Sequence, residues 1–252
     1  MNESRVVVVT GGASGIGAAC VRRFTEAGWR VVVSYYLDSE KAAADALAAA
    51  GRGIAVQGDV GNDADCRRLA REAGDAMGRI DALINSAGTT RLVPHADLDG
   101  LTLDDFVRTT TVNTAGPFQV ARACAPLLAE GDGGAIVIVS SYGAMFGTGS
   151  SIAYAASKGA TNTLTMSLAR VLAPKIRVNA VCPALVSDGF VGRLDPVLFE
   201  ARAAHQIARA PLKKVGTPVD VAADVFWLAT GASLITGTVL SLDCGLHLNG
   251  DG

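Results

Sequence analysis

The sequence is poor in cysteine and histidine, and neither residue type is arranged as a cross-link or a metal site. The five cysteines form no CxxC pair and are odd in number, which argues against a disulfide framework and favours buried thiols in a reducing compartment. The three histidines, His95, His205 and His247, are far apart, so we expect no zinc site and no other bound metal.

Long apolar runs and basic runs are also missing. No apolar run approaches the roughly 20 residues that a membrane span needs, and Val6–Val9 is too short for the core of a secretory signal. Lys and Arg are scattered, and a formal net charge of −2 gives no surface suited to nucleic acid. We therefore predict a cytoplasmic protein that binds a small molecule rather than a membrane or nucleic acid.

The sequence does have enough apolar material for one large core. Half of its 252 residues are hydrophobic and 18% are charged, which is typical of a globular protein and excludes a disordered one. A domain of this length can bury roughly three quarters of the surface that its unfolded chain exposes. We expect residues 1–252 to form a single domain.

Short β-branched runs alternate with helical stretches along the chain. The expected strands are Val6–Val9, Val31–Ser34, Ile54–Gln57, Ala82–Asn85, Ala135–Ser140, Arg177–Cys182 and Val239–Asp243. The expected helices are Ala18–Ala27, Ser39–Ala50, Ala64–Met77, Leu103–Leu128, Tyr154–Leu172 and Pro218–Ala229. This pattern predicts an α/β fold, a doubly wound parallel sheet (Rossmann fold) of about seven strands with helices on both faces. The segment at about 185–212 interrupts the alternation, and we expect it to form a substrate lid.

A glycine-rich turn, Thr10–Gly17, follows the first expected strand and opens a helix. Glycines permit a tight turn whose backbone N–H groups can approach a pyrophosphate, and the helix N-terminus favours the negative charge. The spacing is GxxxGxG rather than the GxGxxG of the general dinucleotide fingerprint. A tight connection without a ligand is the alternative, but phosphates bind after the first strand in this architecture.

Polar and small residues follow two further strands. Asp59 and Val60 end the third, where the carboxylate could accept a hydrogen bond from an adenine amino group or could instead cap a helix or turn. Asn85-Ser86-Ala87-Gly88 ends the fourth, where small residues allow a close approach to a cofactor or simply make a turn.

Tyr154 and Lys158 share one face of an expected helix, because they are four residues apart. A neighbouring ammonium lowers the pKa of a phenol and so tunes it as a proton donor; an ordinary surface pair is the alternative. Ser141 favours the first interpretation, since it follows the fifth strand at the ligand-binding edge, next to the easily confused Ser140. Asn113 is a polar residue in a largely apolar helix, where it could also bond a neighbouring carbonyl and kink the helix.

The ordered set of motifs resembles that of the short-chain dehydrogenase/reductase family, from Val6 to about Gly245. The resemblance implies an NAD(P)(H)-dependent oxidoreductase that moves a hydride between nicotinamide and a carbonyl or secondary alcohol. It implies that Tyr154 exchanges the proton, that Ser141 polarises the substrate oxygen, and that Lys158 lowers the pKa of Tyr154 and binds the nicotinamide ribose. Asn113 would hold a water that relays protons from Lys158. The implied cofactor-binding residues are Gly11, Ser14, Gly15, Ile16, Gly17, Tyr35, Asp59, Val60, Asn85, Ala87, Gly88, Tyr154, Lys158, Pro183 and Val186.

The chain departs from the family pattern at two places. The usual NNAG is Asn85-Ser86-Ala87-Gly88, and the usual Pro-Gly after the sixth strand is Pro183-Ala184. Ser187 and Asp188 stand where a threonine commonly contacts the nicotinamide amide. These departures concern the nicotinamide end and the lid, not the catalytic positions.

The cofactor choice depends on the end of the second strand. NAD enzymes generally place an acidic residue there for the ribose 2′-hydroxyl, and we align Tyr35 with that position. Ser14 brings no basic residue for a 2′-phosphate, whereas Ser34 and Tyr35 could bond one, and Asp38 could favour NAD(H). We favour NADP(H) over NAD(H).

The substrate is less readable from the sequence. The chain resembles 3-oxoacyl-acyl-carrier-protein reductases and related sugar or secondary-alcohol dehydrogenases, and the lid suggests an apolar wall of Leu185, Phe190, Leu194 and Phe199. Its Arg193, Arg202 and Arg209 are either solvated or meet an anionic carrier. The resemblance implies a homotetramer. Ala160, Thr161, Leu164, Leu168 and Ala169 are consistent with a close helix pair between subunits, but packing in the core of one chain explains these residues equally well.

A catalytically silent NAD(P)-binding regulatory protein is the alternative function. A methyltransferase with a glycine-rich turn is a third hypothesis, but it leaves Tyr154 and Lys158 unexplained.

Overall fold

Seven parallel strands form one sheet in this computed structural model, which describes residues 4–248 apart from the side chains of Phe190 and Val191. The strands are β1 (Val6–Thr10), β2 (Arg30–Tyr35), β3 (Ile54–Gln57), β4 (Ala82–Asn85), β5 (Gly134–Val139), β6 (Ile176–Pro183) and β7 (Val239–Leu242). Their order is β3-β2-β1-β4-β5-β6-β7. The chain therefore reverses its direction of travel between β1 and β4, which is where a doubly wound sheet opens a crevice for ligands. The predicted fold class is confirmed.

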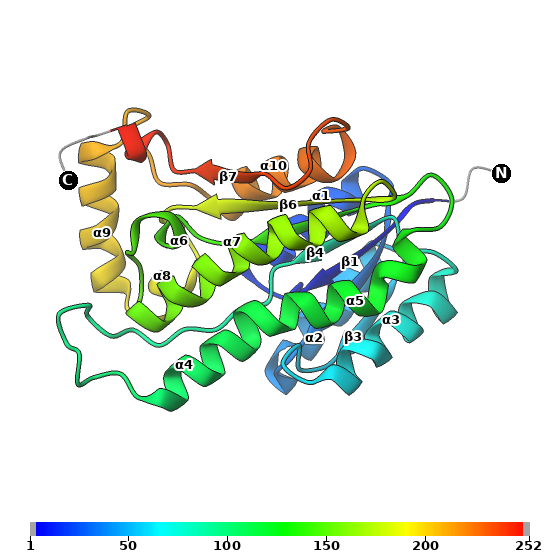
Figure 1. Ribbon diagram of the computed structural model, residues 1–252, viewed down its shortest axis with the longest axis horizontal. Coiled ribbons are helices and arrows are strands. Elements are labelled where there is room, and N and C mark those ends of the chain that lie inside the picture. The colour runs from blue at the N-terminus through cyan, green and yellow to red at the C-terminus, as the bar shows by residue number, and fades with distance from the viewer. Residues whose placement is uncertain (1–3, 249–252) are drawn as a thin grey trace.

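Helices cover both faces of the sheet (Figure 1). One face packs against α1 (Gly15–Glu26), α2 (Lys41–Ala50) and α10 (Pro218–Thr230). The other packs against α3 (Asp63–Met77), α5 (Gly116–Leu128) and α7 (Ile152–Leu172). Successive strand residues point to opposite faces, so Val7 and Val9 join the first core while Val6 and Val8 join the second. Burial on both faces explains why the strands read as unbroken apolar runs.

One long predicted helix differs from its prediction. Instead of one α-helix over Leu103–Leu128, the chain forms α4 (Leu103–Thr110), a π-helical segment (Thr111–Ala115) and α5. The π segment holds Asn113, whose buried side chain bonds outside its own helix. The π segment therefore marks a local interruption around a polar residue, as such segments often do. The expected helix Ser39–Ala50 likewise begins as a 3-10 turn, Asp38–Glu40, ahead of α2.

The segment between β6 and the last helix lies at the carboxyl ends of the strands, on the side where the β6 and β7 arrows point (Figure 1). It forms α8 (Phe190–Leu194) and α9 (Pro196–Arg209). Asp195 caps α9 by accepting a hydrogen bond from the Leu198 N–H at 2.9 Å. Short helical pieces α6 (Gly143–Phe146) and a 3-10 turn, Leu246–Leu248, lie along the same edge. Within residues 4–248, no helix combines the length and apolar character of a membrane crossing.

Candidate active site

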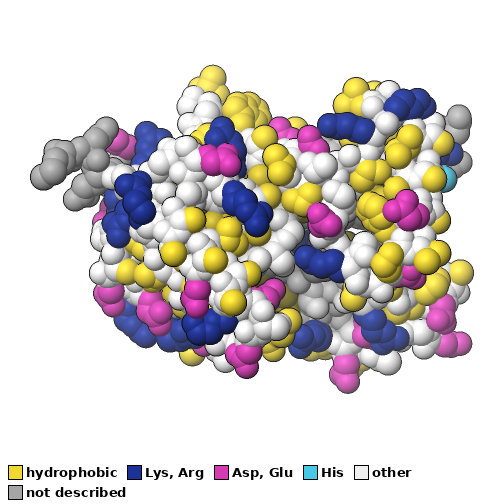
Figure 2. All heavy atoms as spheres, turned by 180° about the vertical axis from the view of Figure 1, so that it is seen from behind, with side chains coloured by type: hydrophobic (Ala, Val, Ile, Leu, Met, Phe, Trp, Pro, Cys, Tyr) yellow, Lys and Arg dark blue, Asp and Glu magenta, His cyan; other side chains and the backbone are white. Residues whose placement is uncertain are grey.

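A cleft of about 1900 Å³ runs along the carboxyl ends of the strands. Seen from behind, the molecule is hollowed on this side, and a basic side chain lies at the hollow (Figure 2). Most of the predicted site residues line the cleft, namely Gly11, Ser14, Gly15, Ile16, Tyr35, Asp59, Val60, Ala87, Gly88, Ser141, Tyr154, Lys158, Pro183 and Val186. The fold thus brings together residues from nearly the whole chain.

The glycine-rich turn packs tightly against its neighbours. Gly11 and Gly15 have positive φ values of 60° and 51°, which favour glycine. A Cβ on Gly17 would lie 2.1 Å from the Gly11 carbonyl oxygen, so the start of α1 can approach the turn only without a side chain. Thr10 Oγ1 accepts hydrogen bonds from the Ser86 and Ala87 N–H groups at 3.1 and 3.2 Å, which joins the ends of β1 and β4. The result is a side-chain-free cradle at a helix N-terminus, which fits a pyrophosphate.

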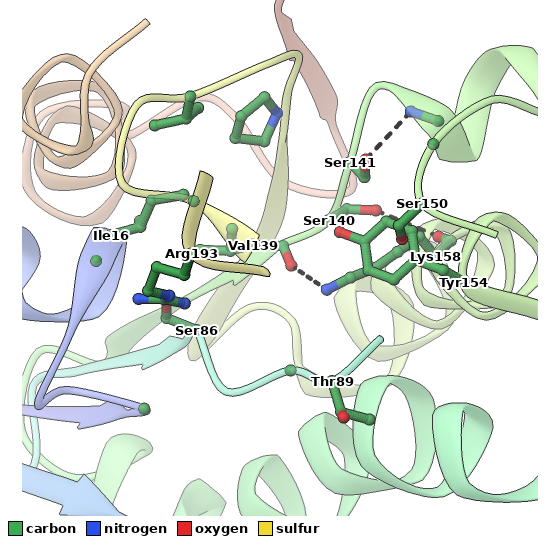
Figure 3. Close-up of a pocket in the computed structure, with 18 of the residues that line it drawn as sticks. Ile16, Ser86, Thr89, Val139, Ser140, Ser141, Ser150, Tyr154, Lys158 and Arg193 are labelled. Carbon is green, nitrogen blue, oxygen red and sulfur yellow. Dashed lines mark hydrogen bonds between the residues drawn. The ribbon is translucent and has the colours of Figure 1, made fainter. Parts of the chain in front are cut away.

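Arg193 reaches this cradle from the lid. Its Nη1 lies 3.3 Å from the position of a Cβ on Gly15, and its side chain lies between Ile16 and Ser86 in the close-up (Figure 3). From the sequence, we expected Arg193 on the lid to be either solvated or in contact with an anionic carrier. The structure places it at the turn that fits phosphates.

The end of β2 forms the other end of the cleft. Tyr35 is only 5% exposed and packs in the core beneath α2, although it also lines the cleft. Two acidic side chains nearby accept hydrogen bonds from other groups of the protein. Asp38 Oδ1 accepts a hydrogen bond from Gln57 Nε2 at 2.7 Å, and Glu40 Oε2 accepts from the Tyr36 and Leu37 N–H groups, each at 3.2 Å. Glu40 lines the cleft, and the sequence analysis missed it.

Some of the predicted site residues form hydrogen bonds within the fold. Asp59 Oδ1 accepts from the Gly61 N–H at 2.8 Å, which is the turn role considered as the alternative, and Asn62 rather than Asp59 caps α3. Three predicted site residues, Gly17, Asn85 and Asn113, are not among those that line the described cleft. The Asn85 side chain is buried and donates to the Pro117 carbonyl at 3.4 Å.

Tyr154 and Ser141 meet in the cleft. Ser151 caps α7 by accepting from the Tyr154 N–H at 3.2 Å, so Tyr154 stands in the first turn of that helix. Burial raises the pKa of Tyr154 to about 12, and a hydrogen bond with Ser141 lowers it in part. The neighbouring Ser140 points elsewhere, because its hydroxyl donates to Asn162 Oδ1 at 2.6 Å. Ser141 is therefore the serine available to a ligand.

Lys158 is 4% exposed and donates from Nζ to the Val139 carbonyl at 2.7 Å (Figure 3). Burial lowers the pKa of this ammonium to about 8. Its Nζ lies 5.8 Å from the centre of the Tyr154 ring. In this structure burial of the phenol raises the Tyr154 pKa more than the Ser141 bond lowers it, and the lowering of that pKa by Lys158 stays a prediction.

Asn113 connects three segments behind the cleft. Its Nδ2 donates to the Thr89 carbonyl and to Ser157 Oγ, both at 3.0 Å, and its Oδ1 accepts from the Thr89 N–H at 2.8 Å. Ser157 Oγ in turn donates to the Tyr154 carbonyl at 2.8 Å. The main-chain carbonyl of Asn113 accepts from Thr161 Oγ1 at 2.8 Å. Ser157 lies within the Tyr154–Lys158 motif and could have been noticed there, whereas its pairing with Asn113 is long-range.

The comparisons with known proteins agree on one family. A family model described as Enoyl-(Acyl carrier protein) reductase matches residues 11–247. A protein of Streptomyces violaceoruber, named as ketoacyl reductase 2 of the granaticin polyketide synthase, is 40% identical over 249 residues, which cover 98% of this chain and 97% of the relative. A 3-oxoacyl-[acyl-carrier-protein] reductase of a Synechocystis species is 31% identical over 251 residues, or 96% of this chain and 97% of the relative. A Burkholderia xenovorans crystal structure described as a short-chain dehydrogenase/reductase is 44% identical, with a TM-score of 0.90 over 98% of this chain and 100% of that one.

Proposed function

Since the chain belongs to the short-chain dehydrogenase/reductase family, and so is an NAD(P)-dependent enzyme acting on alcohol or carbonyl groups, we propose that Tyr154 is its general acid and base. One observation carries the proposal: the Tyr154 hydroxyl bonds Ser141 in the same cleft that holds Lys158 and the glycine-rich cradle. A silent NAD(P)-binding regulator would have no use for this arrangement.

The catalytic roles follow from the contacts. The nicotinamide cofactor supplies the hydride donor or acceptor when it is bound. Tyr154 donates its proton to the carbonyl oxygen during reduction and withdraws it during oxidation, while the Ser141 hydroxyl donates a hydrogen bond to the same oxygen as charge develops there. Lys158, whose pKa lies at about 8, can release and regain a proton near neutral pH. We assign it the supply of protons to Tyr154 and a bond to the nicotinamide ribose.

Asn113 is assigned the support of this proton path. Its side chain bonds both Thr89, which lines the cleft, and Ser157, which lies between Tyr154 and Lys158 in the sequence. A water relay from Lys158 to solvent, as the family resemblance implies, would pass along this polar region. Removal of the Asn113 side chain should therefore lower both the stability of the fold and the rate of turnover.

The cofactor is proposed to lie across the switch point of the sheet. Gly11, Gly15 and Ile16 would hold the pyrophosphate with their N–H groups, and Arg193 would add a charged contact from the lid. Asp59 and Val60 would border the adenine. We propose that the segment 185–212 closes over this cleft as a substrate lid, since α8 and α9 contribute residues to its lining.

NADP(H) is proposed as the preferred cofactor. The aligned position Tyr35 is not acidic and is largely buried. The two carboxylates near it, on Asp38 and Glu40, already accept hydrogen bonds from the chain. A ribose 2′-hydroxyl therefore lacks the committed acidic partner that NAD enzymes generally provide.

Titration with NADPH and NADH, followed by a panel of carbonyl and alcohol substrates read at the nicotinamide absorbance, tests the function. Replacement Tyr154→Phe should lower kcat by at least about a thousandfold, because the proton donor is lost, while cofactor affinity changes little. Activity that survives this replacement would remove Tyr154 from its assigned role. Failure of both cofactors to bind would contradict the proposed function as a whole.

A further inference from the structure

The inner face of the lid helix α9 is basic. Arg202, His205 and Arg209 all line the cleft, and their spacing of three and four residues places them on one side of the helix. Gln206, on the same face, is buried and bonds the Leu185 N–H through Oε1 at 3.1 Å, which fixes α9 against the start of the lid. Arg202 on this face is partly buried, whereas His205 and Arg209 line the cleft and are also exposed to solvent.

Acidic groups of the cleft lie elsewhere. Among the described residues that line it, the carboxylates are those of Glu40, Asp59 and Asp188. Glu40 and Asp59 follow β2 and β3, at the proposed adenosine end. Asp188 lies beside the phosphate cradle, since its carbonyl oxygen is 3.6 Å from the position of a Cβ on Gly15. The buried Asp243 bonds His247 and acts on Tyr142 together with Arg209, so it offsets the charge of Arg209. The positive charge that could attract an anion on this side of the cleft is therefore that of Arg202.

Arg202 is connected to Tyr154 through Gly149. Its Nη2 donates to the Gly149 carbonyl at 3.3 Å. The position of a Cβ on Gly149 is 3.4 Å from Tyr154 Cδ1, so Gly149 packs against the Tyr154 ring. One glycine thus separates the guanidinium from the proposed proton donor, and Arg202 is only partly buried. A guanidinium in this position still has donors available, because it carries five N–H groups in a planar fork.

We propose that the substrate is an oxo acid, or the corresponding hydroxy acid, whose carboxylate is bound by Arg202 while its carbonyl or hydroxyl group faces Tyr154. The inference rests on the proposed function. Gly149 contacts both the Arg202 guanidinium and the edge of the Tyr154 ring, so an anion held by Arg202 would lie near the reacting carbon. The carboxylate of a small oxo acid meets this condition, whereas the phosphate of a long carrier thioester does not.

The test compares acids with their neutral esters. Isothermal titration of the protein loaded with NADP⁺, which cannot reduce these oxo compounds, and of the protein alone, uses acetoacetate, levulinate, the methyl ester of each, and acetoacetyl-coenzyme A. We expect the acids to bind at least about tenfold more tightly than their esters. Arg202→Gln should weaken acid binding by about tenfold to a hundredfold and should reduce the acid-to-ester ratio accordingly. Arg202→Lys should restore part of that ratio, since it keeps the charge but not the fork.

Arg170→Gln is the matched control. Arg170 is exposed near the end of α7, about 24 Å along the helix from Tyr154, and its replacement makes the same charge change. Equal affinity for acids and esters, binding of neither, or an equal loss of both in Arg202→Gln would overturn the inference, the last by showing that Arg202 only supports Gly149. Tighter binding of the coenzyme A thioester than of acetoacetate would overturn it in favour of a carrier phosphate. Loss of cofactor binding would contradict the proposed function instead, and the comparison on the protein alone would still decide this inference.

Discussion

At the scale of single residues, the site depends on how burial changes proton affinity. Burial moves the pKa values of Tyr154 and Lys158 in opposite directions, to about 12 and about 8. Both shifts favour the neutral forms, so the ligand-free pair consists of a phenol that resists ionisation and an amine that releases its proton readily. The phenol therefore holds its proton in the ligand-free protein, and Lys158 is the group of the pair whose pKa lies near neutral pH.

Cofactor choice is a residue-scale prediction centred on Glu40. Its carboxylate lines the cleft and occupies two backbone N–H groups that a 2′-phosphate could otherwise use. Glu40→Gln should raise the ratio of NADPH to NADH affinity by about tenfold, because a negative charge near the phosphate is removed. Tyr35→Asp should shift the same ratio toward NADH. Fluorescence titration of both variants measures the ratio, and no shift in either would show that the ribose lies elsewhere.

At the scale of elements, the π-helical segment connects the Thr89 loop to α7 through the hydrogen bonds of Asn113 and Thr114. Asn113→Ala would leave the N–H and carbonyl of Thr89 without their partner, while the Ser157 hydroxyl would lose one donor but keep its bond to the Tyr154 carbonyl. Each such loss costs about 1–3 kcal/mol, so we expect a total loss of roughly 3 kcal/mol in the free energy of unfolding, together with reduced kcat. Urea unfolding and steady-state kinetics measure these effects.

The control for this prediction lies in the same segment. Thr114→Val removes a single hydrogen bond, from Thr114 Oγ1 to the Ser157 carbonyl at 2.9 Å. It should cost about 1 kcal/mol and leave kcat nearly unaltered. Equal losses in both variants would mean that the π segment responds to any substitution, and not to the connections of Asn113.

The elements also show how far sequence reasoning reaches. Residue periodicity predicted every strand of the sheet within two residues, because apolar strands covered on both faces differ plainly from amphipathic helices. It missed the π segment, because the extra residue per turn leaves no mark on an apolar pattern. The local motifs predicted Ser141, Tyr154 and Lys158 in one cleft. They could not predict the contact of Arg193 with Gly15, because it depends on how the distant lid packs against the glycine-rich turn. They also could not predict the hydrogen bonds that Glu40 accepts, because these depend on the irregular turn after β2.

At the scale of the whole molecule, buried thiols should make the fold sensitive to alkali. Burial raises the pKa of Cys20 and Cys124 to about 12 and that of Cys66 to about 11, from 9.0. Above pH 9 the unfolded chain loses these protons while the folded one keeps them, so stability should fall by about 1.4 kcal/mol per thiol per pH unit up to pH 11. Between pH 8 and 10.5, the lowered pKa of Lys158 should increase stability with rising pH and so cancel about one thiol's share of the decline.

The measurement is the free energy of urea unfolding under reducing conditions at intervals from pH 8 to 10.5. Cys20→Ala should lower stability at pH 8, because it removes a packed side chain, but should flatten the decline above pH 9 by one thiol's share. Parallel curves for the two proteins would contradict the assigned origin of the decline.

Assembly is the last property that belongs to the whole molecule. Of the helix residues named for a subunit contact, Thr161, Leu168 and Ala169 are buried within the chain itself, so core packing explains them. Other apolar side chains remain exposed along neighbouring helices, namely Phe106 and Val107 on α4, Phe118 on α5, and Met166 on α7. Exposed apolar side chains on adjacent helices favour association. We propose that these side chains support the homotetramer that the family resemblance implies.

Light scattering on a sizing column should therefore give four times the 25.7 kDa mass of one chain. Phe118→Glu should yield smaller species, because a charge is buried without a partner on association, while its effect on a single folded chain is small. Leu98→Glu, at a side chain that is also exposed but lies in the loop before α4, should keep the tetramer. A monomeric parent protein, or a Phe118→Glu variant that stays tetrameric, would show that this surface does not assemble the molecule.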